Sequence, residues 1–150
     1  MIKTYWKNFL ENTDRNVNEK CAGVISFGMN VDDCILAVEK ILSGAMSCRI
    51  YPAEGYRKVM SGEAKVGELS IVADWKGVPC AVIETVQVST MPVGELTDEI
   101  CAKEGLQMDL ASWREKQMPM VKAEVEELDG EFDDATLVTV EEFKRVYPCA

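Results

Sequence analysis

The segment from Gly44 to Arg49, GAMSCR, contains side chains that could do chemistry. Ser47 and Cys48 carry nucleophilic atoms, and the planar guanidinium of Arg49 could bind a carboxylate or a phosphate. The chain contains no histidine, so neither nucleophile can have an imidazole as its base. We therefore interpret Ser47 and Cys48 as packing residues, and Arg49 either as an anion clamp or as an ordinary surface arginine.

Glu104 is the second residue of interest because of its place at the end of a predicted helix. The sequence TDEICAKEG predicts a helix that Thr97 caps and Gly105 ends, so Glu104 lies at its C-terminus. The partial negative charge of a helix C-terminus disfavours a carboxylate. We therefore expect Glu104 either to have a partner or to belong to a functional site.

The six cysteines are interpreted as reduced thiols. They are scattered without a C-x-x-C pair, and the N-terminal sequence MIKTYWKNFLENTDRN alternates polar and apolar residues instead of resembling a secretion signal. This pattern predicts a cytoplasmic protein. Without histidine a principal zinc ligand is missing, so we expect no metal site, and no motif indicates a cofactor.

The charge balance limits the partners that the protein can bind. Its 26 acidic and 16 basic residues give a formal net charge of −10, which repels polyanions. Duplex DNA is therefore not expected as a partner. No segment approaches the run of about 20 apolar residues that crosses a bilayer, so we also expect no membrane partner.

The clearest structural signal is a helix from about Val31 to Ser43. Asn30 can cap its first turn and Gly44 can stop it. Its apolar positions recur at helical spacing and form an expected buried face that includes Ile35. A shorter helix is predicted around residues 3–10, where aromatic side chains recur at the same spacing.

Strand signals follow in the second half of the chain. From Leu69, two β-branched runs joined by Lys76 and Gly77 predict a hairpin, whose second strand begins at Cys80 and reaches about residue 89. Helical patterns return with a break at Pro119, and the terminal sequence TLVTVEEFKRVYP predicts a last strand. Helices around a mostly antiparallel sheet define an α+β fold, and a chain of 150 residues suits one domain over residues 1–150.

Five segments form an ordered set along the chain: SFG before the capped helix, Gly44 as the first residue of a G-x-K-x-x-T pattern, KVGELSIVADWKGVPCAVIETVQV, ICAKEGLQMDLASWREKQ and VEEFKRVYP. Together they resemble the ASCH domain family. The resemblance implies a PUA-like, mostly antiparallel pseudo-barrel with flanking helices. It also implies an association with RNA or nucleoside binding.

Some ASCH-like proteins remove the acyl group from acetylated cytidine with three residues, the Lys and Thr of G-x-K-x-x-T and the Glu of A-x-x-E-G. In this sequence those positions are Met46, Arg49 and Glu104. A thioether has no proton to exchange, and a guanidinium stays protonated and is not a nucleophile. The resemblance therefore implies a site in which two of the three hydrolytic groups are replaced.

The resulting hypothesis is an RNA- or nucleoside-ligand-binding module without the family's amidohydrolase activity. The resemblance places Gly44, Met46, Ser47, Arg49 and Glu104 at the ligand, which would be a small nucleoside-like or anionic molecule or single-stranded RNA. We expect Arg49 and Glu104 to face one cavity, either paired or with a ligand between them. The alternative is a hydrolase of modified nucleosides, in which Glu104 is the catalytic acid or base and water replaces the missing threonine.

Overall fold

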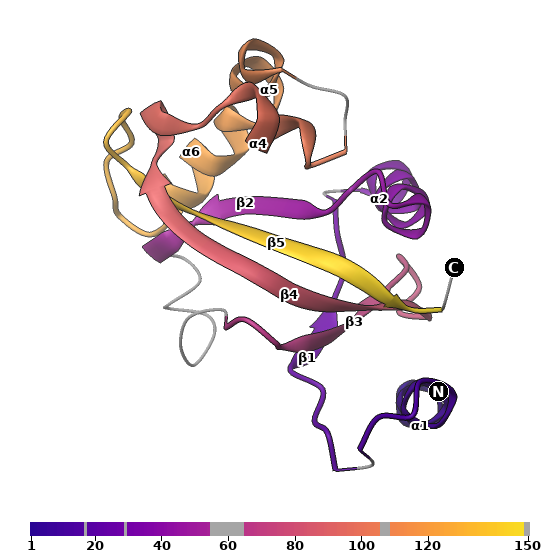
Figure 1. The fold of residues 1–150 in the computed structure, drawn as a ribbon. Helices are drawn as coiled ribbons and strands as arrows, with labels where there is room; N and C mark the ends of the chain where they lie inside the picture. Colours follow the sequence, from indigo (N-terminus) through magenta and orange to yellow (C-terminus); the bar gives the residue numbers. More distant parts are fainter. Residues whose placement is uncertain (17, 29, 55–64, 106–108, 149–150) are drawn as a thin grey trace. The chain divides into compact units, whose positions relative to one another are not determined.

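The computed structural model describes residues 1–16, 18–28, 30–54, 65–105 and 109–148 (Figure 1). The chain forms two compact units. The first comprises Met1–Met46, Val66–Val86 and Phe143–Ala150, and the second comprises Ser47–Lys65 and Gln87–Glu142. The single domain over residues 1–150 stays a prediction.

Five strands form a mixed sheet with the order β1-β3-β4-β5-β2. Strands β3 and β4 pair antiparallel, as do β2 and β5, whereas β1 and β3 are parallel. The predicted α+β class with a mostly antiparallel sheet is therefore confirmed. The strands are β1 (Gly23–Ile25), β2 (Cys48–Pro52), β3 (Leu69–Ala73), β4 (Pro79–Pro92) and β5 (Leu137–Tyr147).

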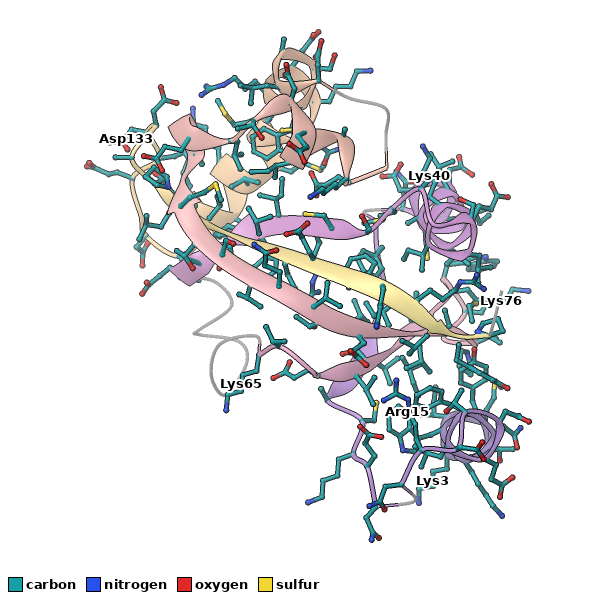
Figure 2. All side chains as sticks on the ribbon, in the orientation of Figure 1. Lys3, Arg15, Lys40, Lys65, Lys76 and Asp133 are labelled. Atoms are coloured by element: carbon teal, nitrogen blue, oxygen red, sulfur yellow. The ribbon has the colours of Figure 1, made fainter. Side chains whose placement is uncertain are left out.

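The hairpin between β3 and β4 turns where the sequence predicts it. The Asp74 carboxylate accepts hydrogen bonds from the backbone N–H of Lys76 at 2.8 Å and of Val78 at 2.9 Å, and Gly77 has a φ of 81°. A positive φ favours glycine, so Gly77 suits this turn. Lys76 extends from the turn in Figure 2. Strand β4 continues beyond the predicted end because its last residues, including Met91, pack against an apolar core.

Helix α2 (Val31–Ser43) is confirmed together with both of its predicted ends. The side chain of Asn30 accepts a hydrogen bond from the Asp33 N–H at 2.9 Å, and Gly44 ends the helix in the left-handed conformation. The expectation that Ile35 is buried is wrong, since it is 44% exposed. The helix buries a narrower face, centred on Cys34 and Ile41.

Helix α1 (Ile2–Asn12) packs within the first unit. Its buried residues Phe9 and Leu10 join a core cluster with Leu69, Ile71 and Val82. Just after the helix, Arg15, labelled in Figure 2, lies 3.2 Å from the Glu84 carboxylate of β4. The predicted N-terminal helix is therefore confirmed, and both apolar and ionic contacts attach it to the sheet.

The second unit contains the 3₁₀ turn η1 (Val93–Glu95) and the helices α4 (Asp98–Ala102), α5 (Leu110–Lys116) and α6 (Met118–Glu127). The predicted break occurs at Gln117, two residues before Pro119. The three helices lie together beside the end of β2 in Figure 1. Their core is built around Trp113, which is 1% exposed. Among the described residues, no helix combines the length and the apolar character needed to cross a membrane.

Candidate functional site

The β2–β5 pair presents two chemically different faces in the second unit. Cys48, Ile50 and Pro52 alternate along β2 with Arg49 and Tyr51, and the first three are buried. Because neighbouring side chains of a strand point to opposite faces, Arg49 and Tyr51 share one face. Their direct partners on β5 lie on that face too. We call it the polar face, and it consists of Arg49, Tyr51, Thr139 and Glu141.

An ion pair forms the centre of the polar face. The Nε of Arg49 donates to Glu141 Oε2 at 2.6 Å, and its Nη2 donates to Oε1 at 3.3 Å. The Tyr51 hydroxyl lies 3.4 Å from the same Oε2, and the guanidinium carbon lies 5.0 Å from the centre of the Tyr51 ring. Glu141 is only 4% exposed, whereas the Arg49 side chain is 23% exposed. A buried carboxylate therefore fixes the guanidinium fork while leaving part of it accessible.

Glu104 has different partners. Its Oε1 accepts a hydrogen bond from Trp113 Nε1 at 2.6 Å, and its Oε2 accepts one from the Ile50 N–H at 3.1 Å. Burial raises the pKa of the Glu104 carboxyl to about 7, although both hydrogen bonds oppose the increase. Helix α4 ends at Ala102, so Glu104 lies in the turn that follows the helix rather than in its last turn.

Glu104 lies beside the outer edge of the sheet, where β2 has backbone groups to satisfy. Strand β2 is last in the strand order, so its outer backbone groups have no neighbouring strand among the described residues. The Ile50 N–H on this edge reaches Glu104, and the Ser47 N–H donates to the Lys103 carbonyl at 2.9 Å. Lys103 also places its Nζ 2.7 Å from Glu142 Oε1. The turn after α4 thus covers the edge of β2.

The structure does not bring Arg49 and Glu104 together. Arg49 projects from the polar face, whereas Glu104 binds the outer edge of β2 and the indole of Trp113, which belongs to the core facing Ile50. The partner of Arg49 is Glu141, a residue that the sequence analysis did not single out. The charges of Arg49 and Glu104 are therefore satisfied separately.

The remaining predicted site residues have backbone or packing contacts. Gly44 ends α2, and Met46 packs against the core cluster of the first unit around Ile41 and Phe143. Ser47 belongs to the second unit, where its N–H donates to Lys103. The structure therefore describes Gly44 and Met46 in one unit, and Ser47, Arg49 and Glu104 in the other.

The thiols of Cys48 and Cys101 are not activated as nucleophiles. Burial raises the pKa of the Cys48 thiol far above its ordinary value and that of Cys101 to about 11. Cys48 is fully buried, in agreement with its interpretation as a packing residue. All described cysteines are free thiols, Cys149 lies outside the described residues, and the described residues contain no cluster of three or more potential metal ligands from Cys, Asp and Glu.

A separate pocket of about 270 Å³ lies in the second unit. Its wall includes Pro52, Val125 and Leu137, together with the carboxylates of Glu54 and Glu131. None of the residues that the sequence predicted for the site lines it. The two acidic groups disfavour an anionic ligand there.

The fold and the similarity to known proteins together define the class and the family of this chain. The strand order and the flanking helices are those of an α+β protein, and solved structures with the same fold identify it as PUA-like. The family model of the ASCH domain matches residues 23–147, so the chain belongs to the ASCH domain family. No curated protein gave a significant match.

Two solved structures are similar over nearly the whole chain. An ASCH domain from Lactobacillus crispatus is 26% identical with a TM-score of 0.86, and the match covers 97% of this chain and 93% of that one. A protein from Enterococcus faecalis is 21% identical with a TM-score of 0.82, covering 97% of this chain and 90% of that one. The predicted PUA-like fold is thereby confirmed.

Proposed function

We propose that this chain is a nucleoside- or RNA-ligand-binding module that lacks the acyl-hydrolase activity of some ASCH-like proteins. Its preferred ligand is a nucleoside-like molecule with hydrogen-bond acceptors that Arg49 can reach. The proposed setting is the cytoplasm, where the free thiols stay reduced.

The observation that carries the proposal is the ion pair between Arg49 and Glu141. Arg49 occupies the position at which the family resemblance places the hydrolytic threonine, and two of its nitrogens donate to a buried carboxylate. A guanidinium held in this way can neither attack a carbonyl nor accept a proton. Met46, at the position of the lysine, packs among apolar side chains and cannot replace that charge.

The polar face offers groups that suit a nucleobase. No described residue accepts a hydrogen bond from Arg49 Nη1, and the Arg49 side chain is partly exposed. The N–H groups of this nitrogen are therefore available to a carbonyl oxygen or a ring nitrogen of a ligand. Tyr51 adds a partly exposed aromatic ring on the same face, whereas Thr139 is buried. Arginine planes and tyrosine rings also stack on bases in many RNA-binding proteins. These features support recognition of a base by hydrogen bonds and stacking.

Charge favours a nucleoside over a long RNA. Glu141 neutralises Arg49, Glu142 pairs with Lys103, and the whole chain carries a formal charge of −10. Tight RNA binding usually needs several unpaired cations along the backbone path. We therefore expect cytidine to bind at least as tightly as its 5′-monophosphate.

The experiment is a calorimetric titration with cytidine, cytidine 5′-monophosphate and a short single-stranded oligoribonucleotide. Saturable binding of cytidine that Arg49→Gln weakens at least tenfold supports the proposal. Lys76→Gln is the matched control, because Lys76 is an exposed cation on the β3–β4 turn. An equal loss of cytidine affinity in Arg49→Gln and Lys76→Gln would refute the proposed site. The absence of binding for all three ligands would refute it too.

A hydrolase with an altered site is the second candidate function, and one observation favours it. The pKa of Glu104 is raised to about 7, where a carboxyl group is well suited to accept and return protons at neutral pH. Both of its oxygens, however, already accept hydrogen bonds from the protein. Acetate release from acetylated cytidine that disappears in Glu104→Gln would establish this alternative.

A further inference from the structure

The pocket of about 270 Å³ in the second unit is formed where three elements meet. Pro52 ends β2, Val125 belongs to the last turn of α6, and Leu137 begins β5. Pro52 pairs with Val138 across the two strands, so the end of β2 and the start of β5 lie side by side. No residue of the polar face lines the pocket, which is therefore a separate place for a ligand.

Contacts within the chain hold the walls of this pocket in place. The Gly130 N–H donates to the Val125 carbonyl at 3.0 Å, and a Cβ at Gly130 would lie only 2.9 Å from Val125 Cγ1. In the loop that leads into β5, the Thr136 hydroxyl accepts a hydrogen bond from the N–H of Asp133, which is labelled in Figure 2, at 2.9 Å. The walls are thus formed before a ligand arrives, which lowers the entropic cost of binding.

Much of the lining is apolar, and part of it is accessible. Leu137 is 47% exposed, whereas Val125 beside it in the lining is 8% exposed. An apolar side chain that stays accessible in a concave site is stabilised by contact with an apolar ligand surface. The pocket therefore favours a ligand with an apolar body over a small hydrated ion.

The charged groups of the lining are all acidic. Glu54 and Glu131 line the pocket and are exposed, and no lysine or arginine is among the described lining residues. Within the described part of the chain, neither carboxylate forms an ion pair. The C-terminal end of α6 forms part of the wall and carries a partial negative charge. These groups together favour a cation.

An organic cation suits the pocket better than a metal ion. The described residues contain no group of three or more potential metal ligands, so two carboxylates would leave most of the coordination of a divalent ion to water. A hydrated ion would also leave the apolar wall around Leu137 uncovered. A ligand with both a charged and an apolar part satisfies the whole lining.

We propose that this pocket binds a small organic cation, with its ammonium group beside Glu54 and Glu131 and its apolar body against Val125 and Leu137. A volume of about 270 Å³ corresponds to roughly nine water molecules at about 30 Å³ each, so the ligand has about ten non-hydrogen atoms. Aromatic and branched aliphatic amines have this size and charge. The occupant is a free small molecule, and its binding does not depend on the function proposed above.

The test is an NMR titration of the isotope-labelled protein with phenethylamine, which matches this size and charge. Phenethyl alcohol is the neutral control probe, because a hydroxyl replaces the ammonium group and the rest of the molecule is the same. We expect saturable shifts of the backbone amides of Leu128, Gly130 and Leu137. The affinity for the amine should be about threefold or more above that for the alcohol, since exposed ion pairs are individually weak. Equal affinities, or no shifts at these amides, would overturn the proposal.

Two substitutions test the two parts of the lining separately. Glu131→Gln should weaken the binding of phenethylamine about twofold or more and leave that of phenethyl alcohol unchanged, because it removes only a charge. Leu137→Ala should weaken the binding of both probes. Glu115→Gln is the matched control, because Glu115 is an exposed carboxylate on α5 outside the pocket. Equal losses of phenethylamine affinity in Glu131→Gln and Glu115→Gln would contradict the proposed site.

Discussion

Arg49 and Glu141 are direct cross-strand partners on β2 and β5, and their shorter nitrogen–oxygen distance is 2.6 Å. The pair spans 92 positions of the sequence. Glu141 is almost completely buried, and Arg49 donates to both of its carboxylate oxygens. The ion pair therefore ties strands β2 and β5 together.

Arg49→Ala should destabilise the fold by about 3 kcal/mol, because it removes the cation that donates to both oxygens of the buried Glu141 carboxylate. Urea denaturation measures the loss. The double variant Arg49→Ala/Glu141→Gln should recover part of the stability, since it also removes the negative charge from this buried position. Additive losses in the double variant would mean that the pair does not couple.

The stability of the protein should depend on the ionisation of Glu104. Its folded-state pKa of about 7 lies above the ordinary 4.5, so the folded state binds more protons between these values. This contribution to the free energy of unfolding is fully present below pH 4.5 and decreases until about pH 7. The difference in melting temperature between the unchanged protein and Glu104→Gln, measured from pH 4.5 to pH 8, isolates it. A difference that is flat with pH would contradict the prediction.

Gly28→Ala should be far more damaging than Gly44→Ala. Gly28 has a φ of 94°, and a Cβ there would lie 2.7 Å from Asp33 Cβ and 2.8 Å from the Cys34 nitrogen. Gly44 has a φ of 83° but open space around it, so its substitution should cost only about 1 kcal/mol. Thermal melting of the two variants checks the ranking. Similar melting temperatures would show that steric contact at the start of α2 is unimportant.

The cysteines should differ in their reaction with a small thiol reagent at pH 8. Cys48 and Cys101 are fully buried, and burial raises the pKa of both thiols, so they should stay unmodified in the folded protein. Cys21 and Cys80 are both partly exposed, but burial raises the pKa of the Cys80 thiol, so Cys21 should react first among the described cysteines. Mass spectrometry of digested protein identifies the modified residues. Early modification of Cys48 would contradict the described packing of β2.

The sequence allowed prediction of structures that depend on neighbours along the chain. Asn30 and Gly44 define the ends of α2 through local hydrogen bonds and backbone conformation, and both positions were recognisable. The Lys76-Gly77 turn is local in the same way. Ile35 shows the limit of this approach. Its helical spacing matched a buried face, but which part of a helix is covered depends on the elements packed against it.

The partners of the site residues were beyond prediction because they are distant in sequence. Glu141 meets Arg49 only because β5 pairs with β2, and Glu104 meets Ile50 across 54 positions. One local signal was present. In LVTVEEF, Thr139 and Glu141 alternate with Val138 and Val140, which indicates a strand with one polar face. The pattern does not reveal which strand supplies the opposing cation.

The most direct test of binding without hydrolysis is to incubate the protein with acetylated cytidine and measure both complex formation and acetate release. We predict saturable binding, full recovery of the intact nucleoside and no acetate above a buffer control. Arg49→Gln should weaken the binding at least tenfold. Acetate release that requires Glu104 would contradict this account and would identify the protein as a hydrolase.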